Sequence, residues 1–169
     1  NEHALVGKII NDLNTEEQQI ALVSDAGTPG ISDPGYLLIS KAIEANIKVH
    51  CLPGPTALIP ALVQSGFPTD EFLFIGFLPH KKGRQKKLKE IAQIQTTIVL
   101  YESPHRILKL IEEIDIYFNK ERTVSISKEI TKIHETNYRG TAQELINLFS
   151  SIVVKGEYVV VIEKNKTKK

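Results

Sequence analysis

Two loops rich in glycine and proline combine polar side chains with residues that expose the main chain. They are residues 24–33, with the sequence SDAGTPGISD, and residues 53–56, with the sequence PGPT. Each loop follows an apolar run, residues 20–23 and 47–52, that we predict as a buried strand. Because open α/β sheets bind ligands at the carboxyl ends of their strands, we expect the two loops to lie side by side and to form part of a crevice. A loop without a ligand, or a stiff turn before a capped helix, is the alternative for each.

The chemistry available in these loops suits a small polar ligand. Glycines let the main chain approach a ligand closely, and Ser24, Asp25 and Thr28 add donors and acceptors. Amides at the start of the helix predicted after Thr56 can donate to a carboxylate or a hydroxyl. Neither loop matches the G-x-G-x-x-G or G-K-[ST] patterns, so an ordinary dinucleotide site or P-loop is not predicted.

The elements that must position these loops alternate along the chain. Residues 20–65 read as strand, helix, strand and helix, which predicts a parallel sheet with right-handed crossovers. A second block begins at residue 72 and carries five predicted strands with helices between them. These strands are residues 72–78, 97–101, 124–129, 135–139 and 157–163. We place a domain boundary between residues 69 and 70, which divides the chain into domains over residues 1–69 and 70–169.

Charge and composition restrict the partners. The chain of 169 residues has 21 Lys and Arg against 20 Asp and Glu, so no net field draws it to a polyanion or a membrane. Six basic residues nevertheless fall within residues 81–89, which is either a phosphate-binding footprint or the solvated face of a helix. No apolar run approaches the ~20 residues that span a bilayer. The lone Cys51 is expected to be buried, no metal site is predicted, and a reducing cytoplasm fits best.

Five segments, in order along nearly the whole chain, resemble those of one enzyme family. They are LVSDAGTPGISDPG at residues 22–35, LPGPTA at 52–57, FIGFLP at 74–79, YESPHR at 101–106 and KEITK at 128–132. Together they resemble the ribosomal RNA small subunit methyltransferase I family of the tetrapyrrole (corrin/porphyrin) methylase superfamily. This resemblance implies an α/β fold of two subdomains, the first a parallel sheet truncated at its N-terminus and the second a mixed sheet with flanking helices.

The resemblance also implies a function. It implies transfer of a methyl group from S-adenosyl-L-methionine to the 2'-hydroxyl of a cytidine in small-subunit ribosomal RNA, by a cytoplasmic homodimer that acts on the RNA or the ribosomal subunit. The cofactor is expected between the two subdomains. Carried over onto this sequence, its contacts are Asp25, Ala26, Gly27, Thr28, Pro55, Thr56, Ala57, Tyr101, Glu102 and Ser103.

Substrate contacts and catalytic groups follow from the same resemblance. The expected RNA contacts are Lys81, Lys82, Arg84, Lys86 and Lys87. Methyl transfer is a direct displacement, so alignment should dominate, with one base or cation to assist. The candidates at the ends of predicted strands are Glu102, His105, Arg106, Lys128 and Glu129. Each has a structural alternative, such as an ion pair between Glu102 and Arg106 or a turn capped by His105.

One departure from the family pattern is the absence of its first segment, a strand ending in a glycine-containing turn. The chain also contains no Met, so we expect a segment of a longer protein that binds the cofactor weakly or not at all and is inactive alone. Two other functions stay open from the residues: methylation of a tetrapyrrole, which is also anionic, and a non-catalytic domain that binds RNA or protein.

Overall fold

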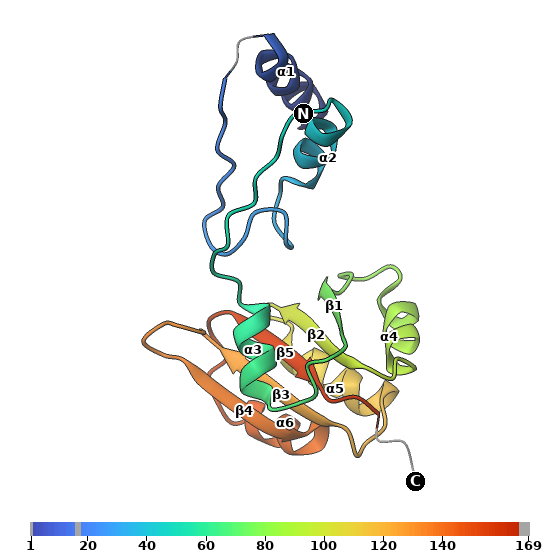
Figure 1. The fold of residues 1–169 in the computed structure, drawn as a ribbon. Coiled ribbons are helices and arrows are strands. Elements are labelled where there is room, and N and C mark those ends of the chain that lie inside the picture. The colour runs from blue at the N-terminus through green and yellow to red at the C-terminus, as the bar shows by residue number, and fades with distance from the viewer. Residues whose placement is uncertain (1, 16–17, 166–169) are drawn as a thin grey trace. The chain divides into compact units, whose positions relative to one another are not determined.

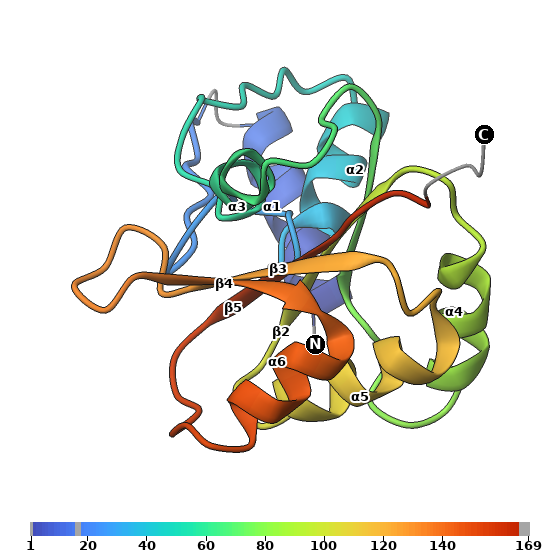
Figure 2. The same ribbon diagram turned by 90° about the horizontal axis from the view of Figure 1, so that it is seen from below.

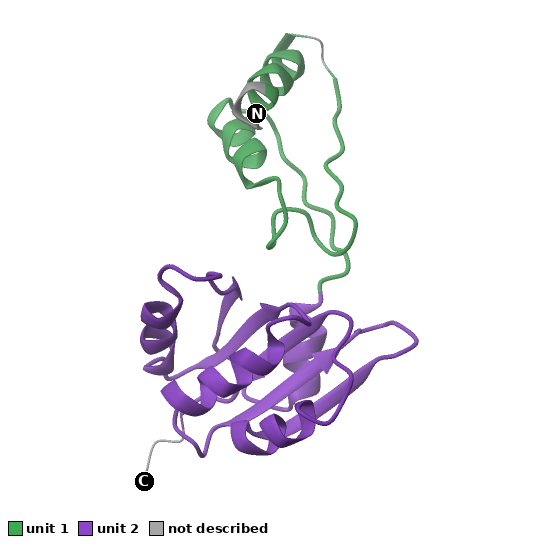
Figure 3. Cartoon of the chain, turned by 180° about the vertical axis from the view of Figure 1, so that it is seen from behind, with its two compact units in different colours: residues 1–56 green, residues 57–169 purple. Residues whose placement is uncertain are grey.

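The structure is a computed structural model that describes residues 2–15 and 18–165. It contains two compact units, residues 1–56 and 57–169, which Figure 3 shows in different colours. The predicted domain boundary lies further along the chain, between residues 69 and 70. The units divide earlier because helix α3, Leu58–Ser65, packs against strands of the second unit. The chain ends in a basic tail over residues 164–169. Residues 166–169 of this tail lie outside the described part.

The first unit is built from two helices that pack against each other. They are α1, Glu2–Thr15, and α2, Tyr36–Glu44. The N-cap of α2 is Gly35, whose φ of 128° suits glycine. A Cβ at Gly35 would come within 2.7 Å of Leu22 Cδ2, so a larger residue there would displace that side chain.

The parallel sheet predicted in this unit is not formed. Residues 20–23 and 47–52 belong to no strand in the described part of the chain. A strand requires a neighbour for its N–H and C=O groups, and neither segment pairs with one. Apolar side chains along both segments are consequently exposed, including Val23 at 80% and Leu52 at 81%. Cys51 is exposed too, contrary to the prediction that it is buried.

The second unit is a five-stranded mixed sheet. In spatial order its strands are β1 (Phe72–Phe77), β2 (Thr97–Glu102), β5 (Tyr158–Ile162), β3 (Thr123–Lys128) and β4 (Thr136–Thr141). The β1–β2 pair is parallel and the other three pairs are antiparallel. The remaining helices are α4 (Arg84–Ala92), α5 (Ile107–Tyr117) and α6 (Ala142–Phe149). This order of strands and helices confirms the predicted α/β class and the mixed sheet with flanking helices.

Alternating apolar residues bury both faces of this sheet. On β5, Val159 and Val161 pack with Ala61 and Leu62 of α3, whereas Val160 belongs to the larger core with α5 and α6. Figures 1 and 2 show α3 alone on one face and α5 and α6 on the other. Successive side chains of a strand point to opposite faces, so a strand covered on both sides is apolar at every position, as β5 is. The sheet thereby holds the ends of its strands in fixed register.

Candidate functional site

The two glycine- and proline-rich loops of the first unit contact each other. The Thr28 hydroxyl donates to the carbonyl oxygen of Pro55 at 3.0 Å. Gly27 lies beside it with φ 78°, and a Cβ added there would meet only the Pro55 oxygen, at 3.9 Å. The prediction that the two loops lie side by side is therefore confirmed. The sheet that was expected to position them is not formed in the described part of the chain. The main chain at Gly27 stays open to a ligand.

The polar and small groups of these loops have different surroundings. Asp25, Ala26 and Pro55 are exposed, while Thr28 and Thr56 are partly buried. The Ser24 hydroxyl is held by the carbonyl of Gly27 at 3.1 Å, so it orders the loop rather than facing a ligand. Ala57, the last residue of the predicted cofactor set in this part of the chain, is the N-cap of α3 in the second unit.

In the second unit, the predicted cofactor and catalytic residues lie at the edge of the sheet that is formed by the ends of its strands, not along an outer strand. Strands β1, β2 and β3 end there, and β5 begins there (Figure 1). Glu102 and Lys128 each lie opposite Tyr158 in the register of their pairings with β5. Two strand spacings separate them, which is about 10 Å between their Cα atoms. The fold thus places Tyr101, Glu102, Ser103, Lys128 and Glu129 together.

Glu102 is the centre of a buried charge network. One of its carboxylate oxygens accepts from the Ser103 amide at 2.8 Å and pairs with Arg106 Nη2 at 2.8 Å. The other oxygen pairs with Arg84 Nη2 at 3.3 Å, and the side chain has no exposed surface. Both oxygens are occupied, so Glu102 holds Ser103 and Arg106 in place. The structural alternative, the Glu102–Arg106 pair, is therefore present.

Arg106 is the one member of this network with a spare donor. Its Nε donates to the Ser103 hydroxyl at 3.3 Å, but its Nη1 is buried and has no partner among the described residues. A buried N–H without a partner is costly, so an acceptor on a ligand would relieve it. His105, next to it, has an exposed side chain.

An aromatic group borders the end of β2. The Tyr101 ring packs edge to face with Phe74 at 5.1 Å and with Phe77 at 5.7 Å between centroids. Phe77 remains half exposed. These rings give the edge an apolar surface next to the charged network.

Glu129 follows β3 in a left-handed conformation, with φ 51°. Its Oε1 accepts from the Glu157 amide at 2.8 Å and from Lys132 Nζ at 3.1 Å. The Glu157 hydrogen bond, and then Lys132, lower the pKa of Glu129 below its ordinary value of 4.5. An ionised carboxylate is therefore part of the turn, whereas neighbouring Lys128 is only partly buried and free of ion pairs among the described residues.

The predicted RNA-binding lysines begin just before α4. Lys81, Lys82 and Lys86 are exposed, and Lys87 is partly buried with Glu90 3.9 Å away. Arg84 differs from the prediction that it contacts phosphate, because only 3% of it is exposed. Its guanidinium binds Glu113, Glu102 and the carbonyl of Pro79, which point it into the protein. Glu113 was not predicted, since only the packing of α5 on α4 brings it there.

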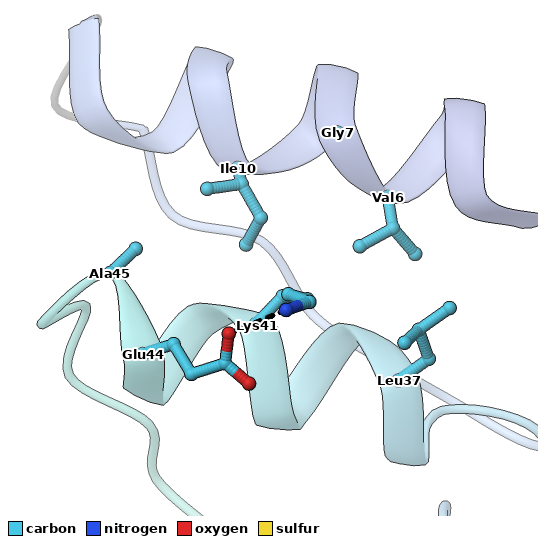
Figure 4. Close-up of a pocket in the computed structure, with 7 residues that line it drawn as sticks. All are labelled: Val6, Gly7, Ile10, Leu37, Lys41, Glu44 and Ala45. Atoms are coloured by element: carbon cyan, nitrogen blue, oxygen red, sulfur yellow. Dashed lines mark hydrogen bonds and ion pairs between the residues drawn. The ribbon is translucent and has the colours of Figure 1, made fainter.

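Two hollows lie within single units. The first, of about 410 Å³, lies between α1 and α2 and is lined largely by apolar groups such as Val6, Ile10 and Leu37 (Figure 4). It is a packing gap between two helices and contains none of the predicted site residues. The second lies at the start of α4 and contains several of the predicted lysines.

Metal-ligating side chains and membrane-spanning helices are two further features that bear on function. Among the described residues, no three His, Cys, Asp or Glu side chains are grouped to hold a metal ion. None of the helices in that part of the chain is both long and apolar enough to cross a membrane.

Comparison with known proteins gives consistent matches. Residues 2–146 match the family model described as Tetrapyrrole (Corrin/Porphyrin) Methylases. Proteins named ribosomal RNA small subunit methyltransferase I from Synechocystis sp. and Hydrogenobaculum sp. are 47% and 46% identical over 96% of the chain. The chain spans 58% of the length of the first relative and 70% of the second.

Solved structures agree on the fold. The methyltransferase CobJ matches with a TM-score of 0.69 at 18% identity, over 97% of this chain and 72% of that one. A uroporphyrin-III-C-methyltransferase from Thermus thermophilus matches with a TM-score of 0.65 at 19% identity, over the same shares. The chain therefore belongs to the tetrapyrrole (corrin/porphyrin) methylase family and, within it, to the ribosomal RNA small subunit methyltransferase I group.

Proposed function

We propose that this chain belongs to an S-adenosyl-L-methionine-dependent methyltransferase that methylates the ribose 2'-hydroxyl of a cytidine in small-subunit ribosomal RNA. The observation that carries the proposal is 41–47% identity, over most of the chain, to relatives that are all named ribosomal RNA small subunit methyltransferase I. The substrate is the RNA or the ribosomal subunit, and the enzyme works as a homodimer in the cytoplasm. Its domains are residues 1–69 and 70–169.

The loops of the first unit suit this cofactor. Gly27 and Gly30 have positive φ values of 78° and 80°, which bring main-chain groups to the surface without side chains in the way. The exposed Asp25 carboxylate can accept from a ribose hydroxyl or an ammonium group. The cofactor contacts proposed here are Asp25, Ala26, Gly27, Thr28, Pro55, Thr56, Ala57, Tyr101, Glu102 and Ser103.

For methyl transfer, the protein must align the ribose oxygen with the methyl group and provide one group that accepts the hydroxyl proton. When bound, S-adenosyl-L-methionine supplies a methyl group that its sulfonium already activates. The ribose oxygen forms a bond to the methyl carbon as the carbon–sulfur bond breaks, and the hydroxyl proton must leave. Glu102 holds Ser103 and Arg106 in place, and Arg106 Nη1 is free to donate to the substrate. His105, Lys128 and Glu129 are the groups at this edge that we propose assist removal of the proton.

Transfer of a labelled methyl group tests the proposal directly. The intact protein is incubated with labelled S-adenosyl-L-methionine and either small ribosomal subunits or a tetrapyrrole precursor. Label in the ribosomal RNA is the expected result. Label in the tetrapyrrole would instead support the activity for which the superfamily is named, and failure to bind the cofactor would support a non-catalytic binding domain.

A further inference from the structure

The hollow at the start of α4 combines residues from two helices. It has a volume of about 520 Å³, and its lining includes His80, Lys81 and Lys86 from around the start of α4 and Lys109 of α5. Arg84 and Glu113 complete the lining. Lys109 lies outside the basic segment over residues 81–89, so the fold adds a cation that the sequence pattern does not contain.

The charges of this hollow do not balance. Arg84 and Glu113 compensate each other, with Nη2 and Oε2 2.7 Å apart. Lys81, Lys86 and Lys109 are exposed, and within the part of the chain that the structure describes none of their ammonium groups has an ion pair or hydrogen bond. Three ammonium groups around one concavity repel one another unless an anion lies between them.

Nearby lysines outside the hollow have other surroundings. Lys87 has Glu90 as a neighbour, and Lys89 lies over the Tyr117 ring at 5.9 Å. Exposed Lys82, just before the helix, also lies outside the hollow, but on α4 itself the lysine without an ion pair or ring contact among the described residues is Lys86, which lines the hollow. The start of α4 adds to the positive charge of the hollow, because Gly83 offers no side-chain cap and the first turn has no acidic residue.

The buried arginine gives the hollow a rigid base. Arg84 Nε donates to both oxygens of Glu113 at 2.9 and 3.1 Å, and its Nη1 donates to the carbonyl of Pro79. These bonds tie α4 to α5 and to the end of β1. Lys86 on α4 and Lys109 on α5 are consequently held at a fixed separation. This favours binding of one compact anion over loosely associated salt ions.

We propose that this hollow binds a phosphate group of the RNA backbone, with Lys81, Lys86 and Lys109 as its ligands and Arg84 as a positioning residue. The inference rests on the proposed function, which makes RNA the substrate, and it deepens that function by assigning Lys109 as a contact. A phosphate offers several acceptor oxygens, so it can accept from more than one of the ammonium groups that line the hollow.

The test is the salt dependence of RNA binding by the intact protein. A fragment of small-subunit ribosomal RNA is titrated with wild type, Lys109→Ala, Lys109→Arg and Lys120→Ala over a series of salt concentrations. Lys120 is a matched control, since it is exposed on the same unit and does not line the hollow. Lys109→Ala should weaken binding several-fold and reduce the slope of log affinity against log salt by about one. Lys109→Arg should restore most of both.

The outcomes separate this inference from the proposed function. Equal slopes for Lys109→Ala and Lys120→Ala, with a wild type that binds and methylates ribosomal RNA, would contradict the hollow as a phosphate site and leave the function standing. A wild type that neither binds nor methylates the RNA would contradict the proposed function as well. Titration of S-adenosyl-L-methionine shows that each variant is folded, because Lys109 is not among the proposed cofactor contacts.

Discussion

At the scale of single residues, the chemistry depends on which charged groups are buried and which are free. Arg84 was predicted to contact phosphate, but its side chain is buried and holds Glu102 and Glu113 in place. Arg106 joins the same network and keeps one N–H without a partner among the described residues. That N–H is the donor that this network offers to a ligand.

Removing Arg84 should be strongly destabilising. Burial alone lowers the pKa of Arg84, but the pairs with Glu113 and Glu102 outweigh it and raise that pKa above the ordinary value. Arg84→Ala would leave Glu113 without its cation and would leave the fully buried Glu102 paired with Arg106 alone. Breaking such a pair costs about 3–5 kcal/mol of the free energy of unfolding, measured by urea denaturation. Lys87→Ala, on the same helix but with a long and partly exposed ion pair, should change it by less than about 0.5 kcal/mol. Similar losses for both variants would contradict the network.

Glu129 should make part of the stability depend on pH. Its pKa in the folded protein is lowered, first by the Glu157 amide and then by Lys132, from an ordinary value of 4.5. A lowered carboxylate pKa stabilises the fold above that ordinary value, and the stabilisation is lost as the pH falls through the folded pKa. Thermal unfolding should therefore show Glu129→Gln less stable than wild type at neutral pH, with the difference shrinking in acid. A difference that is constant with pH would argue against the ionised carboxylate.

At the scale of elements, the second unit follows closely from local sequence. The predicted strand over residues 97–101 is β2, and the predicted Val-rich strand over residues 157–163 is β5. Both contain continuous apolar runs, which is the pattern of strands whose two faces are covered. The prediction of strands over residues 20–23 and 47–52 was wrong, because an apolar run becomes a strand only when another strand pairs with it.

The capping box of α6 gives a test at this scale. The Thr141 hydroxyl accepts from the Glu144 amide, and the Glu144 carboxylate accepts from the Thr141 amide at 2.7 Å. Thr141→Ala removes one acceptor at the helix start and should lower the free energy of unfolding by about 1 kcal/mol. Thr141→Ser keeps the hydroxyl and should retain most of that stability in chemical denaturation. If serine were as destabilising as alanine, packing of the Thr methyl group rather than the cap would be responsible.

The site was harder to predict than its elements. The meeting of the loops at Thr28 and Pro55 was predictable, because both loops follow apolar runs in an alternating pattern. The burial of Arg84 was not, since it depends on Glu113 and Glu102, which are distant in sequence. Lys109 was missed for the same reason: an isolated lysine on an amphipathic helix has no local signal, and only the packing of α5 beside α4 brings it into the hollow.

At the scale of the whole molecule, the chain belongs to the tetrapyrrole (corrin/porphyrin) methylase family, and we propose that it methylates ribosomal RNA. The chain covers 58% of the first relative's length. The segments before its two predicted cofactor loops pair with no strand in the described part of the chain, so no sheet holds these loops in place. We expect these residues by themselves to bind S-adenosyl-L-methionine weakly or not at all. Calorimetric titration of this chain measures that affinity, and a micromolar dissociation constant would contradict the expectation.

The most direct test of the methyltransferase account is the nucleoside composition of small-subunit ribosomal RNA from cells with and without the gene for this protein. Mass spectrometry of the digested RNA should show one 2'-O-methylated cytidine that is lost in the deletion strain and restored by the wild-type gene. Identical nucleoside profiles in the two strains would contradict the account.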